Sequence, residues 1–157
     1  MSVLLVRHGL SAANGRNSAA FGDANASLLP EGLIHGENAG TFLRISGIDT
    51  TTERAAASGM RRSKETAAAA GFTAVSSYDL LNEVNLPVNP ELRAILDREE
   101  IVQEARDAAE RVIANPPAER VWFSHGYLIA ALCKLTEIDT SGMRFIPHFG
   151  EIRELDI

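Results

Sequence analysis

Short apolar runs alternate with longer segments of helical pattern along the chain. The apolar runs at residues 2–7 and 121–123 predict two buried strands. Further strands are predicted at residues 55–58, 73–76 and 145–157, and an extended segment is predicted at residues 78–81. Helices are predicted at residues 12–18, 30–45, 62–70, 97–114 and 127–135. Strands separated by helices are typical of a three-layer α/β/α sandwich with a mainly parallel sheet. We therefore expect residues 1–157 to form a single domain of this class.

Helix boundaries are predicted from capping residues and prolines. Pro30 is suited to the first turn of a helix, and Gly71 is a C-cap for the helix before it. Asp97 and Glu100 have the spacing of a capping box and predict a helix that continues to Ala114. Two inward faces are expected for the longer helices: Leu33, Ala39, Phe42 and Leu43 in the first, and Ile101, Ala105, Ala108 and Val112 in the second.

Composition limits the partners and the compartment. The chain has 157 residues, of which 45% are hydrophobic and 23% charged, with a formal net charge of −6. That charge argues against general binding of nucleic acid or of anionic membranes, so neither is expected as a partner. Cys133 is the single cysteine and is expected to pack in a helix. Arg7 interrupts the N-terminal apolar run, so we expect no signal peptide and a cytoplasmic protein.

Two strands end in a His-Gly pair. Arg7, His8 and Gly9 follow the first apolar run, and His125-Gly126 follows the run at residues 121–123. Open α/β sheets bind their ligands at the carboxyl ends of the strands. Two histidines and an arginine delivered to that edge predict a site for a small, multiply charged anion such as phosphate.

The remaining histidines give no metal signal. His35 lies in a polar helical turn and is expected to be exposed, and His148 flanks the C-terminal strand and is expected to lie outside the cleft. The four histidines show no recognisable ligand spacing, so no metal site is predicted.

Four motifs together resemble one known family. Arg7-His8-Gly9-x-Ser11-x-x-Asn14 resembles the signature of the histidine phosphatase superfamily, which has the phosphoglycerate mutase-like fold. The resemblance continues in three later motifs, in the family's order: Ser58-x-x-x-Arg62-x-x-Glu65-Thr66-Ala67, Leu81-Asn82-Glu83 and Ser124-His125-Gly126. It covers about residues 3 to 130.

The resemblance implies a set of roles. His8 is the expected nucleophile, which forms a phosphohistidine, and Glu83 is the expected general acid and base. Arg7 and Arg62 are expected to clamp the phosphate oxygens, with His125 as a further catalytic donor. The expected substrate-binding set is Arg7, Gly9, Ser11, Asn14, Arg62, His125 and Gly126. The resemblance implies no metal and no cofactor.

The favoured function is a phosphomonoesterase of the histidine acid phosphatase type, acting on a small phosphorylated substrate. Only 41 residues separate Glu83 from His125, so little chain is available to enclose the site. An open site favours hydrolysis over a mutase reaction, which needs water to be excluded. A phosphoglycerate mutase-type phosphotransferase, a protein phosphohistidine phosphatase and a non-catalytic phosphate-binding module remain alternatives. The absence of a Gly-x-Ser-x-Gly elbow argues against a serine hydrolase at Ser124. The oligomeric state stays open.

Overall fold

One sheet organises the molecule. In the computed structural model, which describes residues 1–15, 19–20 and 22–157, five strands pair in the order β3-β2-β4-β1-β5. Their bounds are β1 Ser2–Arg7, β2 Arg54–Ser58, β3 Ala74–Tyr78, β4 Val121–Ser124 and β5 Ile152–Asp156. The β1–β4, β2–β4 and β2–β3 pairs are parallel, and only the edge strand β5 runs antiparallel, against β1. The sheet is therefore mainly parallel, as predicted.

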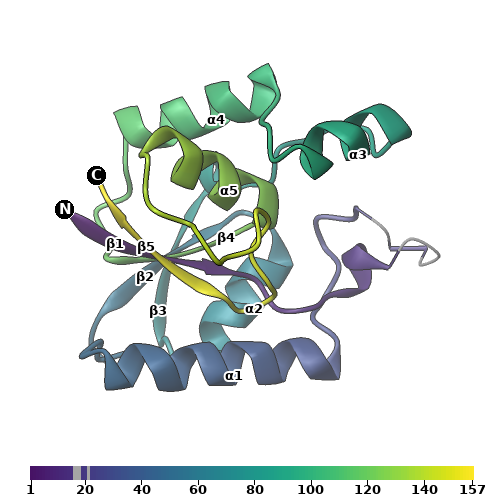
Figure 1. The fold of residues 1–157 in the computed structure, drawn as a ribbon. Coiled ribbons are helices and arrows are strands. Elements are labelled where there is room, and N and C mark those ends of the chain that lie inside the picture. Colours follow the sequence, from purple (N-terminus) through teal and green to yellow (C-terminus); the bar gives the residue numbers. More distant parts are fainter. Residues whose placement is uncertain (16–18, 21) are drawn as a thin grey trace.

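Helices cover both faces of this sheet (Figure 1). One face carries α1 (Pro30–Ile45) and α2 (Arg61–Ala69), and the other carries α4 (Gln103–Ala114) and α5 (Gly126–Leu135). The short helix α3 (Pro90–Asp97) extends beyond α4. Short 3-10 turns lie at Ala12–Asn14 and Asp79–Leu81. The three layers have the predicted α/β/α class, and no helix among the described residues is long and apolar enough to cross a membrane.

Alternate residues of the central strands pack on opposite faces of the sheet. In β4, Trp122 packs with α4 and α5, whereas Phe123 packs with α1 and α2. Leu5 and Val6 of β1 divide in the same way. Side chains of a strand point alternately to opposite faces, so a strand buried on both sides reads as a continuous apolar run. This explains why β1 and β4 were recognisable in the sequence.

The inward face of α1 differs from the prediction. Phe42 is 54% exposed and Leu33 is 45% exposed, so only Ala39 and Leu43 of the predicted face are buried. The buried face consists instead mainly of small residues, because α1 packs closely on α2. A Cβ atom at Gly36 would lie 2.7 Å from the Cβ of Ala69, and one at Gly40 would lie 2.2 Å from the carbonyl oxygen of Ala70.

The prediction of one helix from Asp97 to Ala114 is wrong. The segment instead forms two helices, α3 and α4, and Asp97 ends the first of them. Asn89 caps α3 by accepting a hydrogen bond from the backbone N–H of Leu92 at 2.8 Å, and Pro90 occupies its first turn. In the predicted inward face of this segment, Ile101 lies before the start of α4 and Ala108 is only half-buried. The neighbouring Ala109, which was not predicted to face inward, is fully buried.

Three smaller expectations are also revised. Of the predicted helix at residues 12–18, the structure has a 3-10 turn at Ala12–Asn14, and residues 16–18 lie outside the described part. Strand β3 continues to Tyr78, after which the chain forms a 3-10 turn rather than an extended segment. Within residues 145–157 only Ile152–Asp156 pairs as a strand. The loop before it, residues 145–151, reaches the carboxyl end of β1, where Gly150 donates its N–H to the carbonyl of Arg7.

Candidate active site

Three adjacent parallel strands end at the same edge of the sheet. Ser58 ends β2, Ser124 ends β4 and Arg7 ends β1, and these strands are neighbours in the order β2-β4-β1. His8 and His125 follow directly after β1 and β4. Their rings lie 4.9 Å apart, centroid to centroid. The fold thus brings together two histidines that are 117 positions apart in the sequence.

His8 is held in one tautomer. Its Nδ1 lies 2.7 Å from the carbonyl oxygen of Gly9, which only accepts hydrogen bonds, so Nδ1 carries the proton of the neutral ring. The lone pair is therefore on Nε2, which accepts a hydrogen bond from Nε of Arg62 at 3.3 Å. Burial, together with the charges of Arg62 and Arg7, lowers the pKa of His8 from 6.5 to about 3. The imidazole is neutral at physiological pH and its Nε2 is a potential nucleophile.

Arg62 lies in the first turn of α2 and is 6% exposed. Burial lowers its pKa, and the carboxylate of Glu83 opposes that change. Thr66, one turn further along α2, donates its hydroxyl to the carbonyl of Arg62 at 2.6 Å and accepts the N–H of Gly9 at 2.9 Å. Thr66 thereby links the loop after β1 to the helix that carries Arg62.

His125 is fully buried beside two serine hydroxyls. Its Nε2 lies 2.7 Å from Oγ of Ser58 and 3.2 Å from Oγ of Ser63, and its Nδ1 is buried without a hydrogen-bond partner among the described residues. Burial and the nearby basic side chains lower the pKa of His125 well below 6.5, so it too is neutral. A serine hydroxyl that donates to Nε2 leaves the proton on Nδ1, where it is available to a ligand.

Arg7 is held by the loop at residues 145–151. Its Nη1 donates to the carbonyl of Pro147 at 2.6 Å, and its Cζ lies 4.0 Å above the ring of Phe149. Its Nε is buried without a hydrogen-bond partner in the described part of the chain. Burial lowers the pKa of Arg7 to about 10, so the guanidinium stays charged at neutral pH. Sequence reasoning missed Phe149, because its position depends on how the C-terminal segment folds over β1.

Glu83 lies at the N-terminus of α5. Its carboxylate accepts the backbone N–H groups of Val84, Tyr127 and Leu128, at 3.0, 3.1 and 3.0 Å. Burial raises the pKa of Glu83, while those three donors oppose the rise. The carboxylate also raises the pKa of both Arg7 and Arg62, which places it within electrostatic reach of the two guanidinium groups.

Glycines permit close approaches around the site. A Cβ atom at Gly9 would lie 2.2 Å from the carbonyl oxygen of Gly32 in α1. At Gly126, the first residue of α5, a Cβ atom would lie 3.1 Å from both Cζ and Nε of Arg7. Both glycines therefore make room for neighbouring groups at the site.

Ser11 and Asn14 bond to each other. Oδ1 of Asn14 accepts the hydroxyl of Ser11 at 2.8 Å and its N–H at 3.0 Å. These bonds cap the 3-10 turn at Ala12–Asn14 and commit the amide oxygen of Asn14 to the turn.

His35 is closer to the site than expected. It is half-buried rather than exposed, since its ring stacks on Phe149 and its Nδ1 lies 3.3 Å from the N–H of Leu10. His148 is exposed on the 145–151 loop. The described residues contain no group of three or more His, Cys, Asp or Glu side chains arranged to hold a metal ion.

Two guanidinium groups, two neutral imidazoles and the half-buried carboxyl group of Glu83 thus lie around the carboxyl ends of β1 and β4. This arrangement is suited to a phosphate-binding enzyme of the α/β class. The sequence model of the histidine phosphatase superfamily (branch 1) matches residues 3–92, and the chain belongs to that superfamily. The superfamily includes phosphatases and mutases, which supports an activity of that general type.

Solved structures share the fold at low sequence identity. A phosphoglycerate mutase from Thermus thermophilus is 22% identical, with a TM-score of 0.73 over 99% of this chain and 93% of its own. TTHB049 from the same organism is 21% identical, with a TM-score of 0.72 over 99% and 94%. Rv3214 from Mycobacterium tuberculosis is 20% identical, with a TM-score of 0.64 over 98% and 89%. A search of curated proteins gave no match.

Proposed function

We propose that the protein is a metal-independent phosphomonoester hydrolase that acts through a phosphohistidine at His8, with Glu83 as general acid and base. The observation that carries the proposal is the state of His8: its proton is committed to the Gly9 carbonyl, and its Nε2 lone pair faces the Arg62 guanidinium. A neutral nucleophile beside a fixed cation is what attack on a phosphate dianion requires.

Binding of the phosphoryl group would redirect the donors around His8. Nε of Arg62 now donates to Nε2 of His8, and a phosphate oxygen would compete for that N–H and free the lone pair. Nε of Arg7 and Nδ1 of His125 are buried nitrogens without partners among the described residues, and each suits a further phosphate oxygen. The two arginines supply the positive charge that a metal ion provides in other phosphatases.

The proposed chemistry has two balanced steps. Nε2 of His8 forms a bond to phosphorus as the phosphorus–oxygen ester bond breaks, and the Glu83 carboxylic acid gives its proton to the leaving oxygen. A water molecule then attacks phosphorus while Glu83 takes one of its protons, and the bond to His8 breaks to release orthophosphate. Burial favours the protonated form of Glu83 because it raises the pKa of this carboxyl group, as the first step needs.

Hydrolysis is favoured over a mutase reaction because little chain is available to enclose the site. The segment between Glu83 and His125 is mostly occupied by α3, α4 and β4. A mutase must retain its phosphorylated intermediate away from water, which favours a closed site.

The test is phosphate release with a chelator present, comparing wild type with His8→Ala and Glu83→Gln. We expect wild-type activity to survive the chelator and the His8→Ala variant to be inactive. With a simple alkyl phosphate, Glu83→Gln should lower kcat about a hundredfold or more, because a poor leaving group needs the proton. With para-nitrophenyl phosphate, whose leaving group is better, Glu83→Gln should slow the first step less than the hydrolysis of the phosphohistidine. The phosphorylated protein should therefore accumulate in this variant.

Two outcomes would reject the proposal. Activity in His8→Ala would exclude His8 as the nucleophile. Tight binding of orthophosphate or vanadate by wild type, without turnover of any ester or phosphohistidine protein, would indicate a binding module.

A further inference from the structure

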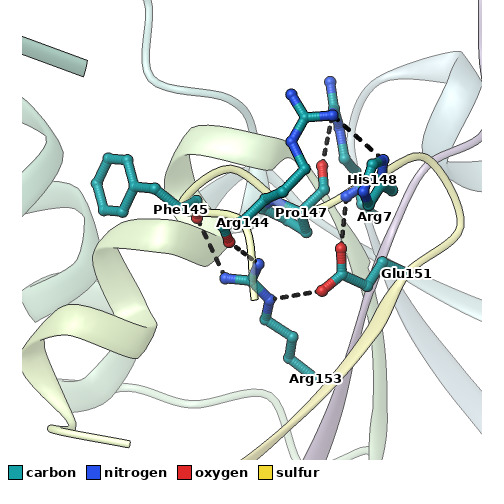
Figure 2. Close-up of polar contacts among 7 residues, drawn as sticks. All are labelled: Arg7, Arg144, Phe145, Pro147, His148, Glu151 and Arg153. Carbon is teal, nitrogen blue, oxygen red and sulfur yellow. Dashed lines mark hydrogen bonds and ion pairs between the residues drawn. The ribbon is translucent and has the colours of Figure 1, made fainter. Parts of the chain in front are cut away.

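Two basic side chains of the C-terminal segment lie next to Arg7 and have no part in the proposed reaction. Arg144 and His148 are both exposed, and Nη1 of Arg144 lies 3.4 Å from Nδ1 of His148 (Figure 2). An arginine only donates hydrogen bonds, so Nδ1 of His148 accepts and its ring proton is on Nε2. The pair therefore presents donors to solvent beside the phosphate site.

An ion pair between the buried Arg153 and the half-buried Glu151 holds the backbone of both residues. Arg153 is 3% exposed, and its Nε lies 3.1 Å from the Glu151 carboxylate. The amino groups of Arg153 donate to the carbonyls of Arg144 and, at 3.2 Å, of Phe145, while the other Glu151 oxygen accepts the N–H of His148 at 2.6 Å. Figure 2 shows this network beneath the exposed pair. The two basic residues are thus anchored at fixed positions rather than carried on an untethered loop.

The charge of Arg144 has no acidic partner in the described part of the chain. Among the described residues it makes no ion pair with a carboxylate, and its charge lowers the pKa of Arg7. Figure 2 shows the Arg7 and Arg144 side chains on the same side of Pro147. Two neighbouring cations repel each other, and a bound anion would relieve that repulsion.

We propose that Arg144 and His148 bind a second anionic group of the substrate, so that the substrate is a small phosphomonoester that also carries a carboxylate or a second phosphate. The inference rests on the proposed function for the placement of the first phosphate among Arg7, His8 and Arg62. Arg144 contributes a planar fork of donors that suits either type of anion.

The test measures binding rather than turnover, with three benzylphosphonates that cannot be hydrolysed. They carry in the para position a carboxylate, a second phosphonate, or a neutral carboxamide of nearly the same shape as the carboxylate. Calorimetry should show that wild type binds at least one of the two anionic compounds about tenfold more tightly than the amide. The compound with the larger gain identifies whether a carboxylate or a phosphate is preferred.

Variants assign the preference to the pair. Arg144→Gln should abolish the preference for the anionic compound and leave the affinity for the amide unchanged, and His148→Gln should reduce the preference in part. Arg106→Gln, at an exposed arginine of α4, removes the same net charge elsewhere and should leave the preference intact. Circular dichroism would confirm that all variants are folded.

Equal affinities of wild type for the three compounds would overturn the inference, as would an Arg144→Gln variant that loses affinity for all three equally. The outcome is independent of catalysis. A preference that depends on Arg144 in a protein without turnover would reject the hydrolase and keep the second anion site. Turnover without such a preference would keep the hydrolase and reject the second anion site.

Discussion

At the level of single residues, the site is defined by donors that are buried but not satisfied. Nε of Arg7 and Nδ1 of His125 have no hydrogen-bond partner among the described residues. Leaving a buried polar group unpaired costs about 1–3 kcal/mol, so native proteins rarely do this without a reason. Both atoms belong to side chains near His8: the ring of His125 lies 4.9 Å from that of His8, centroid to centroid, and the charge of Arg7 lowers the pKa of His8. We interpret them as donors reserved for phosphate oxygens.

Ser58 is expected to set the tautomer of His125. Its hydroxyl lies 2.7 Å from Nε2, so Ser58→Ala removes the closer of the two serine contacts and weakens the preference for a proton on Nδ1. We expect kcat/KM for a simple phosphate ester to fall about tenfold. Ser77→Ala, the same substitution at an exposed position of β3, is the control and should keep full activity. An unchanged kcat/KM in Ser58→Ala would show that the proton on His125 does not contribute.

The sequence indicates only part of this residue-level arrangement. Arg7, His8 and His125 follow apolar runs, and parallel strands end at one edge, so their meeting was predictable. Ser63, Phe149 and Arg144 were not predictable. Ser63 reads as an ordinary helix residue, and the others reach the site only because β5 pairs with the edge of β1 and returns the loop before it to the end of that strand.

At the level of secondary structure, apolar patterns located the strands better than the helix faces. Strands β1 and β4 are buried on both sides and read as unbroken apolar runs. The predicted inward face of α1 is wrong because it assigns large apolar residues to the interior, whereas the tight contact with α2 selects glycine and alanine. Helix α3 was missed because Pro87 and Pro90 suggested a break, although Asn89-Pro90 is also a helix start.

The glycine face of α1 should therefore be sensitive to added volume. Gly40→Ala would place a Cβ atom 2.2 Å from the Ala70 carbonyl oxygen, which forces α1 and α2 apart. We expect a loss of about 1–3 kcal/mol in the free energy of unfolding, measured by urea denaturation. Ile45→Ala, at an exposed residue of the same helix, should change stability far less. Equal stability of wild type and Gly40→Ala would contradict this packing.

Gly126 should matter for substrate binding in a different way. Gly126→Ala would bring a Cβ atom to 3.1 Å from Nε and Cζ of Arg7 and 2.8 Å from Cγ2 of Ile146. Arg7 must then shift, so we expect KM for phosphate esters to rise about tenfold or more. Steady-state kinetics would test this, with Gly40→Ala as a variant that perturbs packing away from the site. A normal KM in Gly126→Ala would mean that Arg7 does not depend on this close approach.

For the whole molecule, the charge of the chain and that of its site have opposite signs. The formal net charge is −6, yet Arg7, Arg62 and Arg144 lie near the carboxyl ends of β1 and β4. Low accessibility of Arg62 and Arg7 to water strengthens their attraction for an anion. The site therefore attracts an anion although the chain as a whole is acidic, which favours a small anionic ligand over an extended polyanion such as nucleic acid.

Keeping two histidines neutral inside the fold should make stability depend on pH. Burial and neighbouring arginines lower the pKa of His8 from 6.5 to about 3, and the pKa of His125 is lowered in the same direction. In the unfolded chain both rings take up protons once the pH falls below 6.5. The free energy of unfolding should therefore decrease as the pH falls from 6.5 towards 3, by up to about 1.4 kcal/mol per pH unit for each histidine.

Urea denaturation of wild type, His8→Gln and the His8→Gln/His125→Gln double variant would measure this dependence. Contributions from carboxyl groups are largely shared by the three proteins, so the difference in slope against pH reports the histidines. The slope should be smaller in His8→Gln and smaller still in the double variant. Identical slopes would mean that these rings become protonated in the folded protein, and a nucleophile protonated at mildly acidic pH would lose activity there. Wild-type phosphate release should instead persist well below pH 6.5, because the proposed attack uses the neutral ring that the fold maintains.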